Sequence, residues 1–141
     1  MPTLHHIAIA CSNLERSQAF YEEVFEMEVL IDYGSTAPYA KRDRLLAMTN
    51  VANRALLLGN EAMRIELIEF TSPPDDSAST PAVNRLGLSH IAVETSDIQK
   101  DYERLKTLGV HCNSEPIDFG SVTAVYSHDP DGNTIEWLQI S

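Results

Sequence analysis

The stretch that decides the fold is His-Ile-Ala-Ile-Ala at residues 6–10, because it occurs twice in the chain. It returns as His-Ile-Ala-Val-Glu at residues 90–94. A second block, Arg-Ile-Glu-Leu-Ile-Glu-Phe at residues 64–70, returns as Thr-Ile-Glu-Trp-Leu-Gln-Ile at residues 134–140. Two blocks that recur in the same order indicate two similar structural modules.

The repeat sets the predicted organisation of the chain. We assign residues 4–70 to module one and residues 88–141 to module two. The stretch between them, residues 71–87, is rich in Pro, Ser and Asp, which is typical of a linker. Both modules together, residues 1–141, are expected to form one domain, since this length suits a single domain.

Each module is expected to run as a strand, a helix and then further strands. Apolar and other side chains alternate in the two opening strands, and a capping box follows each of them, Ser12-x-x-Glu15 and Ser96-x-x-Gln99. Further strands are predicted over residues 27–31, 45–49, 55–58 and 63–70 in module one, and over residues 110–113, 122–128 and 134–140 in module two.

Composition excludes several classes of partner. The 141 residues carry 10 Lys and Arg against 21 Asp and Glu, a formal net charge of −11. Nucleic acids and anionic membranes repel such a chain at long range. No apolar run is long enough to span a bilayer, and the N-terminus does not look like a signal peptide. We therefore expect a cytoplasmic protein that binds a small molecule.

Four side chains at repeated positions carry the predicted chemistry. His6 and His90 open the two repeated strands, while Glu66 and Glu136 stand in the middle of apolar strands. Burying a carboxylate there is costly unless it is paired or bound to a cation. Two imidazoles and two carboxylates suit a borderline divalent ion, if the two modules bring them together.

This pattern, which closes with Asp-Pro-Asp-Gly-Asn-Thr-Ile-Glu136, resembles the vicinal oxygen chelate superfamily. That superfamily includes glyoxalase I, methylmalonyl-CoA epimerase, extradiol dioxygenases, fosfomycin-resistance enzymes and bleomycin-binding proteins. The resemblance implies an α+β fold in which two paired βαβββ modules form a curved mixed sheet around a metal-binding cavity. It also implies a homodimer, and a divalent Ni, Co, Zn, Mn or Fe ion held by His6, Glu66, His90 and Glu136.

The implied reaction is proton abstraction next to a carbonyl, as in an epimerase or a glyoxalase-like isomerase or lyase. Glu66 and Glu136 would be both metal ligands and catalytic bases. Ala10 and Phe70 stand where bacterial glyoxalases I have the Arg and Asn used for glutathione, which favours another substrate. An extradiol dioxygenase stays open but is disfavoured, because Glu66 would crowd its iron. A metal-free protein that sequesters a drug or metabolite is the third alternative.

A basic cluster and three other histidines complete the set of candidates. Lys41, Arg42 and Arg44 are predicted to hold an anionic part of the substrate, although a solvated loop is an equal alternative. We expect His5 and two histidines without a repeat counterpart, His111 and His128, to be structural.

Overall fold

The computed structural model describes residues 1–75 and 82–141, which fall into two compact units on either side of residues 76–81. The predicted linker, residues 71–87, contains that stretch, so this part of the prediction lies outside the described residues. Residues 71 and 72 extend the last strand of the first unit. Each unit has its own sheet and its own helix-covered core.

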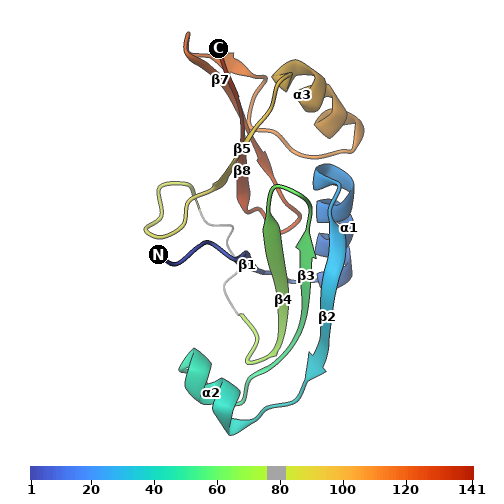
Figure 1. The fold of residues 1–141 in the computed structure, drawn as a ribbon, viewed down its shortest axis with the longest axis vertical. Coiled ribbons are helices and arrows are strands. Elements are labelled where there is room, and N and C mark those ends of the chain that lie inside the picture. Colours follow the sequence, from blue (N-terminus) through green and yellow to red (C-terminus); the bar gives the residue numbers. More distant parts are fainter. Residues whose placement is uncertain (76–81) are drawn as a thin grey trace. The chain divides into compact units, whose positions relative to one another are not determined.

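The first unit is a mixed four-stranded sheet with two helices (Figure 1). The order along the sheet is β1-β4-β3-β2, with β1 parallel to β4 and the other neighbours antiparallel. Its elements are β1 (Ile7–Ala10), α1 (Leu14–Phe25), β2 (Glu28–Thr36), α2 (Ala40–Leu46), β3 (Ala52–Gly59) and β4 (Arg64–Ser72).

The second unit repeats this topology with shorter elements. Its order is β5-β8-β7-β6, with β5 parallel to β8 and the other neighbours antiparallel. The repeat therefore confirms the predicted α+β fold of βαβββ modules. The elements are β5 (Ile91–Glu94), α3 (Ile98–Thr107), β6 (Ile117–Asp118), β7 (Val122–His128) and β8 (Thr134–Ile140).

In each unit one long helix covers one face of the sheet. Helix α1 packs on β3 and β4 (Figure 1), where Ile65 and Leu67 are fully buried beneath it. Helix α3 packs on β7 and β8, where Ile135 and Trp137 are buried in the same way. Because side chains alternate along a strand, the residues between these pairs point to the other face of each sheet.

Two predicted strands take another form. Residues 45–49 lie at the end of helix α2 and in the turn after it. Asp43 closes that turn by accepting hydrogen bonds from the backbone amides of Asn50 and Val51 at 2.8 and 2.9 Å. In residues 110–113 the only bridge is Cys112 to Ser127, and the short strand β6 takes the sheet edge instead.

The helix starts lie one residue later than the predicted capping boxes. Asn13 Oδ1 accepts from the Arg16 amide at 2.8 Å, and Asp97 Oδ1 accepts from the Lys100 amide at 3.0 Å. Ser12 instead accepts from the Arg16 guanidinium at 2.9 Å. Asn and Asp cap at least as well as Ser, so the side chain nearest the first turn takes the position. No helix of the described residues is long and apolar enough to cross a membrane.

Helix α1 ends on a residue in the left-handed region. Glu26 has φ 52° and ψ 38°, a conformation that costs an L-residue with a side chain about 1–2 kcal/mol. The matching exit of α3 is followed by Gly109, whose φ of 74° carries no such cost. The first unit therefore contains local strain that the second avoids.

Candidate metal centre

His6 and Glu66 form one pair on the face of the first sheet that α1 does not cover; we call it the first half-site. His6 directly precedes β1, and the parallel register sets Ala8 beside Glu66 on β4. The small Ala8 leaves room for the imidazole to reach the carboxylate. His6 Nε2 lies 3.2 Å from Glu66 Oε2, and both side chains are partly exposed.

His90 and Glu136 form the same pair in the second unit, the second half-site. His90 directly precedes β5, and the register sets Ala92 beside Glu136 on β8. His90 Nε2 lies 3.2 Å from Glu136 Oε2, again with both side chains partly exposed. Each sheet therefore brings together one predicted His and one predicted Glu.

The other ring nitrogen of each histidine is held by the preceding residue. His5 Nδ1 lies 2.7 Å from His6 Nδ1, and Ser89 Oγ lies 2.8 Å from His90 Nδ1. When Nδ1 carries the proton and donates it to this contact, Nε2 keeps its lone pair for a cation. The sequence predicts a structural His5, and the structure places it in contact with His6; Ser89, which makes the matching contact, is not among the predicted residues. Both residues can be found from the sequence, because His5 directly precedes His6 and Ser89 directly precedes His90.

Two side chains that bind the same ion have their donor atoms close together, and the donor atoms of each half-site are close enough. Nitrogen and oxygen ligands about 2.0–2.2 Å from a cation lie about 3.0–3.5 Å apart at tetrahedral or octahedral angles. The 3.2 Å between Nε2 and Oε2 in both half-sites is in this range. Each half-site supplies two donors, and no group of three or more His, Cys, Asp or Glu that could hold a metal is found within residues 1–75 and 82–141.

Tyr126 adds a third side chain to the second half-site only. It lies opposite Glu136 in the antiparallel β7–β8 register, and its ring centroid is 5.5 Å from that of His90. Burial, and to a smaller extent the charge of Glu136, raises the pKa of the Tyr126 phenol. The corresponding position opposite Glu66 is Leu57. Sequence comparison of the repeats pointed to residues they share and so missed Tyr126.

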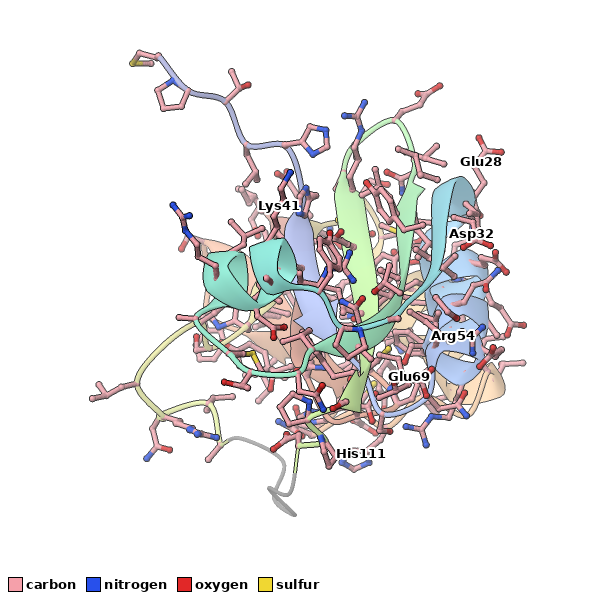
Figure 2. All side chains as sticks on the ribbon, turned by 90° about the horizontal axis from the view of Figure 1, so that it is seen from below. Glu28, Asp32, Lys41, Arg54, Glu69 and His111 are labelled. Atoms are coloured by element: carbon pink, nitrogen blue, oxygen red, sulfur yellow. The ribbon has the colours of Figure 1, made fainter. Side chains whose placement is uncertain are left out.

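Of the three residues in the predicted basic cluster, Arg42 contacts neighbouring side chains, and Lys41 and Arg44 are exposed. Arg42 donates to Thr36 Oγ1 and, at 2.6 Å, to Asn53 Oδ1, and its guanidinium lies 5.2 Å from the Tyr39 ring centroid. Lys41 and Arg44 are exposed on the same helix, and Figure 2 shows Lys41 on α2. Arg42 thus ties α2 to β2 and β3.

On the helix-covered side, charged residues hold structure together. Arg54 lies 2.5 Å from Glu15 of α1 and 3.6 Å from Glu69 of β4, and Figure 2 shows Arg54 and Glu69 close to α1. The Arg54 hydrogen bond holds the pKa of Glu15 below its usual value. In the second unit His128 lies on the same face of β7 as Tyr126, which α3 does not cover. Its ring stacks on that of His111 at 5.5 Å, and its Nε2 lies 2.7 Å from Asn113 Oδ1.

The family comparison covers nearly the whole chain. The family described as Glyoxalase/Bleomycin resistance protein/Dioxygenase superfamily matches residues 3–137. A lactoylglutathione lyase of Neisseria meningitidis serogroup B is 28% identical over 138 residues, which are 96% of this chain and 89% of that protein.

Solved structures share the fold at lower identity. A glyoxalase family protein from Bacillus cereus has a TM-score of 0.80 at 21% identity, with 99% of this chain and 95% of that chain covered. The fosfomycin resistance protein FosX from Listeria monocytogenes, in a complex with Mn(II) and 1S,2S-dihydroxypropylphosphonic acid, has a TM-score of 0.67 at 20% identity, with 97% of this chain and 91% of that chain covered.

Proposed function

Because the chain belongs to the Glyoxalase/Bleomycin resistance protein/Dioxygenase superfamily, we propose that it is a divalent-metal-dependent enzyme. The reaction is that of an epimerase or a glyoxalase-like isomerase or lyase, which takes a proton from the carbon next to a carbonyl. The observation that supports this most is the repetition of one His–Glu pair, at 3.2 Å, on both sheets. A structural ion pair would not need to recur with the same atoms and register.

The four donors suit a borderline ion such as Zn, Ni, Co, Mn or Fe(II). His6 and His90 would bind it through Nε2, with Nδ1 held by His5 and Ser89. Glu66 and Glu136 would bind it through a carboxylate oxygen. Substrate oxygens would complete the coordination of an ion held by these four side chains.

The carboxylates also carry the acid–base step. A bound divalent ion would supply Lewis acidity, which would make the C–H next to a substrate carbonyl more acidic. Glu66 or Glu136 accepts that proton on a carboxylate oxygen and returns it to the same or the neighbouring carbon. Both are partly exposed, so a substrate carbon can approach either of them.

Two alternatives predict different results. An extradiol dioxygenase would use His6, His90 and one carboxylate for iron, and Glu66 would then be an additional charged ligand. A sequestering protein would not need the paired donors at all. Metal analysis of the purified protein separates the three functions. Stoichiometric Ni, Co, Zn or Mn supports the epimerase or isomerase, and iron with catechol turnover supports the dioxygenase. No metal affinity together with tight drug binding supports sequestration.

The decisive experiment follows the proton. The metal-loaded protein is incubated in D₂O with candidate acyl-CoA thioesters and ketoses, and the substrate is examined for deuterium at the carbon next to the carbonyl. Label that depends on the metal and on both half-sites is the expected result. Stoichiometric metal with no exchange into any such substrate would contradict the proposed reaction.

We also propose that the protein is a cytoplasmic homodimer. Mixing two inactive variants tests whether each metal site combines half-sites from one chain or from two. One variant carries His6→Ala with Glu66→Gln, and the other carries His90→Ala with Glu136→Gln. If each site combines half-sites from two chains, the mixed dimer contains one intact site and exchange activity returns. If both half-sites belong to one chain, the mixture stays inactive.

Lys41 and Arg44 are the remaining candidates for holding an anionic substrate group. The double variant Lys41→Ala/Arg44→Ala leaves the Arg42 contacts to Thr36 and Asn53 in place. It should raise KM for an anionic substrate and leave kcat close to the wild-type value. An unchanged KM would mean that α2 is simply a solvated helix.

A further inference from the structure

The second half-site has an acidic neighbour that the first half-site lacks. Glu94 is the last residue of β5 and stands four residues after His90. The repeat places Ala10 at the matching position, four residues after His6. One of the two repeated surfaces therefore carries a carboxylate where the other carries a methyl group.

Strand register places the Glu94 side chain on the same open face as the second half-site. In the parallel pair of β5 and β8, Val93 lies beside Trp137, which is buried beneath α3. Ala92 lies beside Glu136. Because side chains alternate along a strand, Glu94 points to the same side as Ala92, and both residues are exposed. Strand rise and strand spacing put the Cα atoms of Glu94 and Glu136 about 8 Å apart.

No positive charge of the second unit accompanies Glu94. Within residues 1–75 and 82–141 its carboxylate has no hydrogen bond and no ion pair. The four strands of this unit, all of them in the described part of the chain, contain no Lys or Arg. Arg85 precedes His90, at the other end of β5. The remaining basic residues lie on α3, which packs on the other face of the sheet: Lys100, Arg104 and Lys106.

The neighbours of Glu94 on the open face are apolar. Leu138 lies beside it on β8, and Ala124 lies beside Leu138 on β7. An apolar neighbourhood lowers the effective dielectric constant, so an ion pair formed there is stronger than one in open water. A cationic group of a bound molecule would therefore gain more from Glu94 than from an ordinary surface carboxylate.

We propose that Glu94 selects substrates that carry a positively charged group, such as an ammonium, a few bonds from the oxygens that lie next to His90 and Glu136. The ammonium donates a hydrogen bond to the Glu94 carboxylate while the reacting end of the molecule lies at the second half-site. The proposal rests on the metal-dependent function proposed above and narrows its substrate class to aminated carbonyl compounds. Ala10 gives the first half-site no such preference.

Two hydroxamates that differ only at one end test this without a known substrate. 6-Aminohexanohydroxamate and hexanohydroxamate both chelate through two neighbouring oxygens, and the first ends in an ammonium. The full chain is loaded with Co(II), whose affinity is measured by competition with a chelating dye, and each hydroxamate is titrated by the visible absorption of Co(II). The affinity ratio of the charged to the uncharged compound should be about threefold to tenfold higher in wild type than in Glu94→Gln. The Co(II) affinity of the two proteins should agree within about threefold.

Matched variants separate a local contact from the overall charge of the protein. Glu103→Gln removes the same charge from α3, on the covered side of the sheet, and should keep the wild-type ratio. Glu94→Lys should reverse the preference, so that adipic acid monohydroxamate, which ends in a carboxylate, binds more tightly than 6-aminohexanohydroxamate. Equal ratios in wild type and Glu94→Gln would overturn the proposal, as would an equal loss in Glu103→Gln.

The failures can be told apart. If wild-type protein does not bind Co(II), the proposed function is wrong and the Glu94 proposal falls with it. If Co(II) binds but neither hydroxamate binds the loaded protein, or both bind with a ratio that Glu94→Gln does not change, only the Glu94 proposal is overturned.

Discussion

Ser89 Oγ lies 2.8 Å from His90 Nδ1, so this imidazole is held from the side opposite the carboxylate that it faces. The first unit reaches the same result with His5, whose Nδ1 lies 2.7 Å from His6 Nδ1. Different residues therefore do one task in the two repeats. Contacts of this kind orient metal-binding imidazoles and fix the nitrogen that carries the proton.

Ser89→Ala is expected to lower divalent-metal affinity by about tenfold to a hundredfold, the usual effect of losing such a contact. The measurement is Co(II) competition with a chelating dye, and urea unfolding of the metal-free protein checks the fold. Ser114→Ala removes an exposed serine that contacts the carbonyl of Glu115, and should bind Co(II) like wild type. Equal affinities in both variants would mean that Ser89 does not position His90.

Glu66→Gln and Glu136→Gln are each expected to reduce turnover by at least about 10²-fold, the scale of a lost acid–base group. The amide keeps the shape of the side chain, so circular dichroism should be unchanged. Glu69→Gln is the control, because Glu69 of β4 pairs with Arg54 on the helix-covered side. Near-normal turnover in both half-site variants would contradict the proposed mechanism.

Asn13→Ala should reduce the free energy of unfolding by about 1 kcal/mol, because the Arg16 amide loses its partner at the start of α1. Asp97→Ala should do the same for α3. Ser12→Ala removes only a contact to the Arg16 side chain and should cost less. Urea unfolding measures all three, and a larger loss for Ser12→Ala than for Asn13→Ala would restore Ser12 as the cap.

Glu26→Gly should stabilise the protein by about 1 kcal/mol, since glycine adopts the left-handed conformation without the side-chain clash. Gly109→Ala tests the reverse at the exit of α3, where φ is 74°, and should destabilise. Thermal and urea unfolding give the comparison. A destabilised Glu26→Gly would show that the Glu26 side chain contributes more than its backbone strain costs.

The Glu15–Arg54 pair makes stability depend on pH. The pKa of Glu15 in the folded chain is below its usual value, mainly because of the Arg54 hydrogen bond. Its contribution is therefore fully present above the unfolded pKa and is lost as pH falls through the lowered folded pKa. Glu15→Gln should be less stable than wild type at pH 7, and the difference should shrink in acid. A difference that grows as pH falls would contradict this.

Repetition made most of the fold predictable from sequence. His6 and His90 stand at equivalent places, and the alternation in residues 64–70 and 134–140 put Glu66 and Glu136 on the face that the helices leave open. These features are local, because a strand fixes which face each side chain takes.

What the sequence could not predict depends on contacts between distant residues. The strand predicted at residues 45–49 is wrong, because residues 45 and 46 end helix α2 and the turn after it is set by Asp43, which accepts from the amides of Asn50 and Val51. Tyr126 was missed because only strand register places it opposite Glu136. A comparison that looks for residues shared by the two repeats does not find a position at which they differ.

The difference between Leu57 and Tyr126 has a stereochemical consequence for the proposed site. Two half-sites with the same side chains would offer a small molecule the same contacts in two opposite orientations. With Leu57 opposite Glu66 and Tyr126 opposite Glu136, the two half-sites offer a bound molecule different contacts. The proposed proton transfer is therefore expected to give a product of one configuration.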